Sequence, residues 1–392
     1  MFDFDETIDR RGTESVKWDE FPGTLPMWVA DMDFRTAPCV REALQRRLDH
    51  GVFGYEFLPD TYFESISRWF SSRHGWNGIK RENIVPTTGV IAAYSAAIKA
   101  MTVPGDKVIV MTPCYNAFFP AIRNNKCETL RCPLRLENGR FSIDFEDFEE
   151  KAADPRARVL LLCNPHNPVG RVWTREELTR VGEICLSHNV FVISDEIHCE
   201  LTYPGHDYTP FATLPAELAS NSVSCISPTK AFNIAGIQIA NIFAHEKEIV
   251  RKMDRAINDN ECCDVNVFGA TALQAAYNEG GPWLDELRKY LWDNAMTVYE
   301  FLRKELPEVT APPLEGTYLM WLDCRKALHE GEEVEGLSER LTEHLLDKVK
   351  LVLSTGTIYG EEGEGFMRLN IACPRETLKE GLRRLRDGVL SY

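Results

Sequence analysis

The sequence predicts an α/β protein with a mostly parallel sheet in its main part and a smaller α+β part at its C-terminal end. The main part alternates continuous apolar runs with helical patterns. Continuous runs are typical of strands that helices cover on both faces. Their alternation with helices indicates strand–helix–strand units and parallel strands. The chain of 392 residues is long enough for two domains of ordinary size.

The strands of the predicted sheet are short apolar runs, and two helices between them have clear sequence signals. One helix covers residues 89–101, contains many small residues and begins at a glycine. The other follows Thr174, which stands three residues before Glu177 in the spacing of a capping box. The predicted strands cover residues 107–113, 158–165, 190–196, 222–228 and 239–244.

The last third of the chain has a different pattern. Residues 282–306 form a long amphipathic helix with a proline near its start, and short apolar runs alternate with two more helices after it. We expect this long helix to mark a domain boundary. The expected division is an N-terminal segment of residues 1–45 that packs with the small domain, a large domain of residues 46–285 and a small C-terminal domain of residues 286–392.

Composition restricts the class of partner. A formal net charge of -16 disfavours binding to nucleic acid or to anionic membrane surfaces, because both need clustered Lys and Arg. The longest apolar runs are too short to span a bilayer, and we see no targeting segment. The 12 cysteines contain no CxxC pair, and the adjacent Cys262 and Cys263 are expected to pack as ordinary apolar residues. We therefore expect a reduced, cytoplasmic protein without nucleic-acid or membrane partners.

Polar residues follow several of the predicted strands at the point where each strand ends. Asn164 and Asn167 lie in the stretch CNPHNPVG, Asp195 ends the run FVISD, and Lys230 follows CISPT. The stretch TTGV, residues 87–90, lies between a short apolar run and a helix. Ligands in open α/β sheets bind outside the carboxyl ends of the strands. We therefore expect these groups to share one ligand site.

Each of these groups also has an ordinary structural explanation when it is taken alone. Gly89 at a helix N-terminus suits an anion, but many strand-to-helix turns contain a glycine. Asp195 could cap a helix or pair with a cation, and a lysine such as Lys230 is usually a solvated surface group. Together, however, an anion site, a carboxylate for a ring nitrogen and a desolvated lysine that attacks an aldehyde are what pyridoxal 5′-phosphate needs.

The motifs NPHNPVG, SDEIH and SPTK, in this order, resemble those of the fold-type I pyridoxal-phosphate enzymes, the aspartate aminotransferase superfamily. The likeness extends over nearly the whole chain. Four longer stretches are similar to its branch of carbon–sulfur β-lyases, which includes cystathionine β-lyases and cystalysin-type enzymes. The resemblance implies a seven-stranded, mostly parallel sheet between helices, a smaller α+β domain, and a homodimer with shared active sites. The four stretches are residues 27–34, 227–236, 315–325 and 365–375.

The resemblance also implies roles for residues that match its motifs. Lys230 would bind the cofactor covalently and move the proton at Cα, and Asp195 would pair with the pyridine nitrogen. Tyr115 would stack on the cofactor ring, and Arg368 would hold the α-carboxylate of a small amino-acid substrate. Tyr55 would reach the cofactor phosphate of the neighbouring subunit. The other implied cofactor contacts are Gly89, Val90, Ser227 and Thr229 at the phosphate, Asn167 at the ring O3′ and His198 close to it, where many relatives carry a tyrosine.

One position departs from the typical aminotransferases. They carry an arginine that binds the cofactor phosphate eight residues after the lysine, and here that position is Gln238. A neutral amide donates hydrogen bonds but supplies no charge, so N–H groups, a helix dipole and hydroxyls would have to balance the phosphate. The β-lyase branch also tends to lack this arginine, and Gln238 therefore favours that branch.

Three functions remain open on these grounds. The first is a β-lyase that cleaves cystathionine, cystine or cysteine to pyruvate, ammonia and a thiol. The second is an aminotransferase that moves an amino group between an amino acid and a 2-oxo acid. The third is a cofactor-binding protein without catalysis, which the presence of Lys230, Asp195, Asn167 and Arg368 disfavours. Both catalytic routes use the same residues up to proton removal at Cα, so only the branch motifs and Gln238 favour the lyase.

Overall fold

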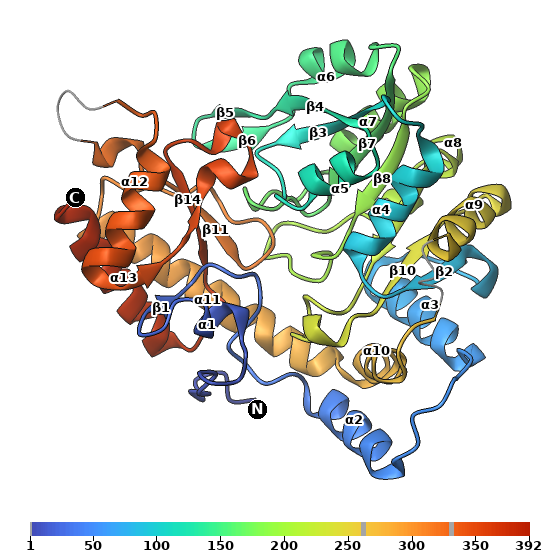
Figure 1. Cartoon of the computed structure of the whole chain (residues 1–392), viewed down its shortest axis with the longest axis horizontal. Coiled ribbons are helices and arrows are strands. Elements are labelled where there is room, and N and C mark those ends of the chain that lie inside the picture. Colours follow the sequence, from blue (N-terminus) through green and yellow to red (C-terminus); the bar gives the residue numbers. More distant parts are fainter. Residues whose placement is uncertain (1, 260–263, 329–332) are drawn as a thin grey trace.

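The computed structural model describes residues 2–259, 264–328 and 333–392. Cys262 and Cys263, for which we predicted ordinary packing, lie outside the described residues. Figure 1 shows a larger group of elements around one sheet and a smaller group built from the C-terminal part of the chain. Helix α11 (Gly281–Glu305) runs from one group to the other.

The large sheet has seven strands in the order β2-β10-β9-β8-β7-β3-β4. Strand β10 is antiparallel to both of its neighbours, and the other pairs of neighbouring strands are parallel. The predicted seven-stranded, mostly parallel sheet is therefore confirmed. The bounds are β2 (Ile84–Thr87), β3 (Lys107–Thr112), β4 (Glu128–Pro133), β7 (Ala157–Cys163), β8 (Phe191–Asp195), β9 (Ser222–Ile226) and β10 (Ala240–Phe243).

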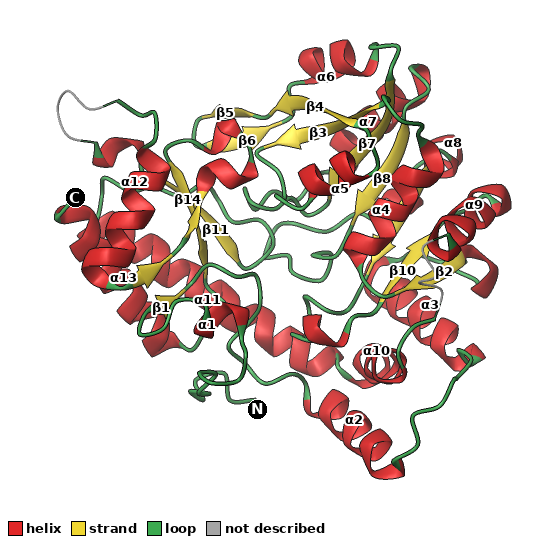
Figure 2. Ribbon diagram, viewed as in Figure 1, coloured by secondary structure: helices red, strands yellow, loops and turns green. Residues whose placement is uncertain are grey.

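Helices cover both faces of this sheet, as Figure 2 shows. Successive side chains of β7 point to opposite faces, so that Leu161 packs in one apolar cluster and Leu160 in another. This arrangement explains why the central strands are continuous apolar runs. The cluster with Leu161 includes α4 (Val90–Met101), α5 (Phe118–Asn124) and α9 (Lys247–Asn258), and the cluster with Leu160 includes α6 (Phe145–Ala152), α7 (Arg175–Ser187) and α8 (Ala216–Ser220).

The sequence patterns missed strand β4 and the hairpin formed by β5 (Arg135–Glu137) and β6 (Arg140–Ser142). Strand β4 lies at the edge of the large sheet, and most of its side chains are partly exposed. An edge strand does not need a continuous apolar run, and in ETLRCP polar residues interrupt the apolar ones. The apolar signal therefore identified the buried strands and not this one.

The smaller group is built around a three-stranded antiparallel sheet in the order β11-β14-β13. The N-terminal segment joins this group, because β1 (Leu25–Pro26) pairs with β12 (Leu351–Val352) and Asn370 N donates to Met27 O at 2.9 Å. The other elements are β11 (Leu319–Asp323), β13 (Ser354–Thr355), β14 (Phe366–Asn370), α12 (Leu337–His344), which continues into a π-helical turn (Leu345–Val349), and α13 (Arg375–Leu390).

Three further helices pack together as a group. Helix α2 (Pro38–His50) and helix α3 (Asp60–His74) both pack against α10 (Val267–Glu279). Residues 51–59 connect α2 to α3 along the outside of the molecule (Figure 1). Among the described residues, no helix combines the length and the apolar character that crossing a membrane requires.

The capping box of α7 is present in the structure and gives a test of local stability. Glu177 N donates to Thr174 Oγ1 at 3.1 Å, and Thr174 N donates to Glu177 Oε2 at 2.8 Å. We expect Thr174→Ala to destabilise the protein by about 1 kcal/mol, because it leaves a helix N–H without a partner. The melting temperature should fall measurably, while Thr174→Ser, which keeps the hydroxyl, should lose clearly less. An equal loss in both variants would contradict the capping role.

Candidate active site

A cavity of about 350 Å³ lies at the carboxyl ends of the parallel strands. Its size falls within the usual range for ligand pockets. The structure brings eight of the sequence-predicted site residues to its wall, together with Gln238. The eight residues are Gly89, Val90, Tyr115, Asn167, Asp195, His198, Thr229 and Lys230.

Asp195 is the last residue of β8, and its carboxylate is buried. It accepts a hydrogen bond from Ile197 N at 3.2 Å and, within the described part of the chain, forms no ion pair. Burial raises the pKa of Asp195 to about 7, and the charge of Glu196 acts in the same direction. A buried carboxylate without a counter-ion is costly. The cavity therefore offers a place for a cationic group beside Asp195.

Lys230 lies in the turn after β9, and its side chain faces the cavity. Its Nζ donates to Ala30 O at 2.5 Å. Burial lowers the pKa of Lys230 to about 8, and the charge of Arg368 adds to this effect. A larger share of the amine is then neutral near physiological pH than for a surface lysine, and a neutral amine is the form that attacks a carbonyl carbon.

Arg368 lies in the middle of β14, and only 4% of its surface is exposed. Its Nη1 donates to Asn167 Oδ1 at 3.1 Å, and its Nη2 donates to Trp28 O at 2.7 Å. The Nε of Arg368 has no hydrogen-bond partner, and the guanidinium forms no ion pair with the residues that the structure describes. A buried cation with neutral partners and a free N–H is suited to an anionic ligand.

Two other predicted residues at the wall are uncharged. Burial lowers the pKa of His198 to about 3, and the charges of Lys230 and Arg368 lower it further, so the imidazole is neutral. Its Nδ1 is buried and has no hydrogen-bond partner among the residues that the structure describes. Burial raises the pKa of Tyr115 to about 12, so the phenol keeps its proton. Both side chains can therefore contact a ligand through neutral polar atoms.

The start of α4 forms the part of the wall that suits an anion. Gly89 is the N-cap residue and Val90 the first residue of this 12-residue helix. Gly89 has an extended backbone, and a Cβ placed on it would meet no protein atom within 4 Å. The space in front of the helix N-terminus is therefore open, and unpaired N–H groups and the helix dipole favour negative charge there.

Ser227 lies behind Thr229 and is not part of the cavity wall. Its Oγ donates to Ile239 O at 2.6 Å and accepts from Thr229 N at 3.1 Å. The hydroxyl proton of Ser227 is therefore used within the protein. The predicted contact of Ser227 with a phosphate stays a prediction.

Tyr55 is a predicted site residue that does not line the cavity of a single chain. It lies in the segment of residues 51–59 and is fully exposed. Phe53 and Phe57 of the same segment are also largely exposed. The predicted contact of Tyr55 with a neighbouring subunit therefore also stays a prediction.

Sequence reasoning missed the backbone groups that contact the two cationic side chains of the site. Trp28 O accepts from Arg368, and Ala30 O accepts from Lys230. A carbonyl group is present in every residue, so it leaves no signal in the sequence. The similarity of residues 27–34 to a family motif pointed to this segment, but not to its contacts.

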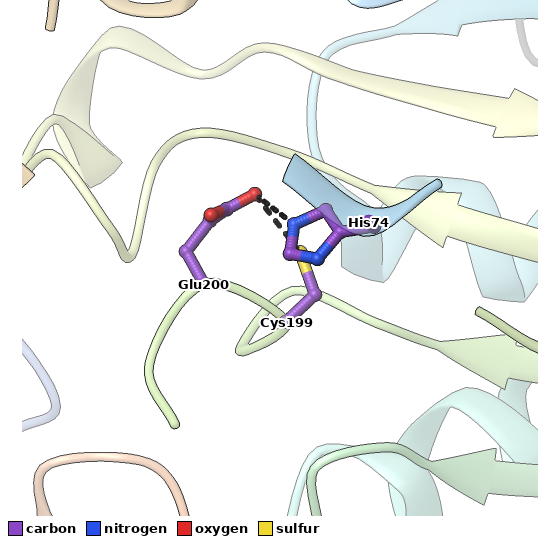
Figure 3. A group of neighbouring side chains, drawn as sticks. All are labelled: His74, Cys199 and Glu200. Carbon is purple, nitrogen blue, oxygen red and sulfur yellow. Dashed lines mark hydrogen bonds and ion pairs between the residues drawn. The ribbon is translucent and has the colours of Figure 1, made fainter. Parts of the chain in front are cut away.

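One group of side chains outside the cavity has the chemistry of metal ligands. Figure 3 shows that His74, Cys199 and Glu200 converge. Glu200 accepts hydrogen bonds from Trp69 Nε1 at 2.6 Å, Arg73 Nε at 3.2 Å and His74 Nε2 at 2.8 Å. Burial raises the pKa of the Cys199 thiol well above its usual value, which makes it a poor ligand. We interpret the group as a buried ion cluster that connects α3 to the loop after β8.

This cluster predicts a pH-dependent contribution to stability. Burial opposes ionisation of Glu200, but His74 and Arg73 lower its pKa from 4.5 to about 2. Because the pKa of Glu200 is lower in the folded protein than the value of 4.5 expected for the unfolded chain, the ionised carboxylate stabilises the fold above pH 4.5. This contribution is lost as the pH falls toward 2. We expect Glu200→Gln to cost roughly 3 kcal/mol at neutral pH.

The measurement is the difference in melting temperature between wild type and Glu200→Gln as a function of pH. The difference should shrink as the pH falls below 4.5. The matched control is Glu64→Gln, which changes an exposed residue of the same helix and should show little difference at any pH. A difference for Glu200→Gln that does not vary with pH would contradict the ion cluster.

Comparisons with known proteins agree with the fold and with the cavity. The family model described as "Aminotransferase class I and II" matches residues 26–385. Cystathionine beta-lyase PatB of Bacillus subtilis (strain 168) is 44% identical, over 98% of this chain and 98% of that protein. The crystal structure of cystalysin from Treponema denticola, which contains a pyridoxal 5′-phosphate cofactor, has a TM-score of 0.94 and 34% identity and covers 100% of this chain and 99% of that one.

The crystal structure of a PLP-bound C-S lyase from Staphylococcus hominis also matches nearly the whole chain. Its TM-score is 0.92 and its identity 32%, and the match covers 99% of both chains. The family model and these full-length matches agree with the predicted superfamily and with its β-lyase branch. The chain therefore belongs to the class I and II aminotransferase family.

Proposed function

We propose that the chain is a carbon–sulfur β-lyase that depends on pyridoxal 5′-phosphate and cleaves cystathionine, cystine or cysteine-type substrates to pyruvate, ammonia and a thiol. The observation that carries this proposal is one cavity lined by Lys230 and Asp195, with Arg368 bound to Asn167 of its wall, in which neither Asp195 nor Arg368 forms an ion pair with a described residue. The full-length match to a named cystathionine β-lyase supports the reaction type.

The donor set of the cavity fits pyridoxal 5′-phosphate. The unpaired carboxylate of Asp195 suits a protonated ring nitrogen, and the open N-terminus of α4 suits a phosphate. When bound, the cofactor supplies an aldehyde that joins an amine and a protonated ring that accepts electrons from Cα. Lys230 would hold the aldehyde carbon. The other contacts would be Gly89, Val90, Thr229 and Ser227 at the phosphate, Asn167 and His198 at the ring hydroxyl, and Tyr115 on the ring face.

The remaining side chains of the site would bind the substrate and move its proton. Arg368 would bind the α-carboxylate, and its Nε would give up no hydrogen bond to a described residue in doing so. Lys230 would take the proton from Cα, because its lowered pKa makes the amine a base near neutral pH. In a lyase, the electrons left at Cα then expel sulfur from Cβ.

A second candidate function is amino transfer between an amino acid and a 2-oxo acid. The observation that favours it is the description of the matched family model as aminotransferases. Both reactions use Lys230, Asp195 and Arg368 up to proton removal. Gln238 supports the lyase, because it stands at the cavity where typical aminotransferases have an arginine.

We also propose that the protein is a homodimer with shared active sites, in which Tyr55 reaches the neighbouring subunit. The support is the exposure of three aromatic side chains in one segment, namely Phe53, Tyr55 and Phe57.

The division into residues 1–45, 46–285 and 286–392 remains our proposal for the domains. A reduced, cytoplasmic location is supported by the ten described cysteines, which are all free thiols.

The test of the reaction is a product assay with the purified, cofactor-loaded protein. We expect cystathionine or cysteine to give pyruvate together with a thiol or sulfide when no 2-oxo acid is added. The physical reason is that β-elimination needs no amino acceptor, whereas amino transfer does. Pyruvate formation that required an added 2-oxo acid would contradict the lyase and favour the aminotransferase.

Lys230→Ala is the control for the catalytic scheme. This variant should lose the visible absorbance of the covalently bound cofactor and nearly all turnover, since it removes both the attachment point and the base. Full turnover in this variant would refute the role of Lys230. No activity with any amino acid, despite bound cofactor in the wild type, would favour a cofactor-binding protein without catalysis.

A further inference from the structure

Residues 27–34, which we call the strap, lie between the turn that carries Lys230 and the strand that carries Arg368. After β1 the strap has no regular secondary structure. Its carbonyl groups contact both cationic side chains of the site. Ala30 O accepts from Lys230 Nζ at 2.5 Å, and Trp28 O accepts from Arg368 Nη2 at 2.7 Å. The strap thus physically connects Lys230 and Arg368.

Asn233 holds the strap from the side of Lys230. Its Oδ1 accepts from Met32 N at 3.0 Å, and its Nδ2 donates to Met32 O at 2.9 Å and to Phe34 O at 2.7 Å. Asn233 has a φ of 53°, in the left-handed region that asparagine tolerates better than most residues. The turn that presents Lys230 therefore also presents three hydrogen bonds to the strap.

Asn370 holds the strap from the side of Arg368. It follows Arg368 by two residues on β14 and is buried. Its Nδ2 donates to Val29 O and to Asp31 O, both at 2.6 Å, and its Oδ1 accepts from Ala372 N at 2.8 Å. Each of the two cationic residues therefore has an asparagine close to it in sequence that binds the same strap.

The chemistry of these contacts leaves the cationic charges available. Carbonyl groups satisfy N–H donors of Lys230 and Arg368 but bring no full negative charge. The charge of Asp31 in the strap acts on Lys230 and raises its pKa, against the larger effect of burial, but the Asp31 carboxylate is itself bound by Arg10 at 2.6 Å. A carboxylate beside Arg368 would compete with an anionic ligand, and a carbonyl does so much less.

We propose that Asn233 and Asn370 are positioning residues that hold the strap from two sides and thereby set the spacing between Lys230 and Arg368. This inference rests on the proposed function, in which Arg368 binds the substrate carboxylate while Lys230 acts at Cα. A substrate whose carboxylate is bound by Arg368 must present its Cα to Lys230. The spacing between the two side chains therefore controls the rate of proton removal. Small misplacements of this kind reduce rates strongly.

The test is Asn233→Gly in the cofactor-loaded protein. Glycine adopts a φ of 53° without strain, so the variant deletes the three hydrogen bonds and keeps the backbone conformation. The matched control is Asn138→Gly, which makes the same change at a φ of 51° in the exposed turn between β5 and β6. Two quantities are measured, namely hydrogen exchange of residues 27–34 and the kinetic constants with cystathionine.

We expect faster exchange of the Met32 amide in Asn233→Gly, because this amide donates to the deleted Oδ1. We expect kcat/KM to fall on the order of 10- to 100-fold, mainly through KM, and the control to be unchanged in both measurements. In an Arg368→Lys background, Asn233→Gly should raise KM much less, since it acts through the position of Arg368. If Asn233 had a purely structural role, the effects of Asn233→Gly and Arg368→Lys on the free energy derived from KM would instead be additive.

Faster strap exchange with unchanged KM and kcat would overturn the inference, and so would additive effects in the double variant. If Asn233→Gly does not fold, Asn233→Asp tests the same point, because it keeps the acceptor for Met32 N and loses both donated hydrogen bonds. If the wild type is an aminotransferase, the same comparison is made with its amino donor. Failure of the proposed reaction and failure of this inference are therefore distinguishable.

Discussion

The site depends on two buried charges that have no counter-ion in the described part of the chain, the carboxylate of Asp195 and the guanidinium of Arg368. An unpaired buried charge destabilises a fold unless the surrounding structure holds it in place. Asp195 is held by the fully buried strand β8 and Arg368 by the fully buried strand β14. The two strands belong to different sheets, and Arg368 reaches the cavity wall through its hydrogen bond to Asn167.

Each missing charge corresponds to a group that the proposed ligands would bring. A protonated ring nitrogen would pair with Asp195, a phosphate would meet the N-terminus of α4, and an α-carboxylate would pair with Arg368. The electrostatics of the site are thus complementary to both the proposed cofactor and the proposed substrate class. Burial lowers the pKa of Lys230 to about 8, the charge of Arg368 lowers it further, and the charge of Asp195 acts in the opposite direction.

Much of this arrangement could be predicted from the sequence, because it follows from burial and local signals. The apolar runs identified five strands of the large sheet, and the capping box fixed the start of α7. Strand-end groups pointed to Gly89, Asn167, Asp195 and Lys230 of the cavity wall, and the family resemblance added Val90, Tyr115, His198 and Thr229. These features depend on side chains and on short-range spacing, which the sequence contains directly.

Other features depend on the path of the backbone and could not be predicted in this way. Strand β10 runs antiparallel to both of its neighbours, and its apolar residues do not reveal that direction. The edge strand β4 lacks an apolar run, and the proton of the Ser227 hydroxyl is donated to a carbonyl twelve residues away. The strap acts through carbonyl groups, which every residue possesses. Contacts between backbone groups far apart in the chain could therefore not be predicted from the sequence patterns.

The most direct measurement of the central claim compares wild type with Asp195→Asn, with and without cofactor. A raised pKa means that the charged carboxylate destabilises the cofactor-free fold above pH 3.8, and this penalty is complete above about pH 7. Asp195→Asn should therefore raise the melting temperature of the cofactor-free protein at pH 8, by a gain that vanishes near pH 4, and should weaken cofactor binding. A variant that is less stable than wild type at pH 8, or that binds the cofactor equally well, would contradict the account.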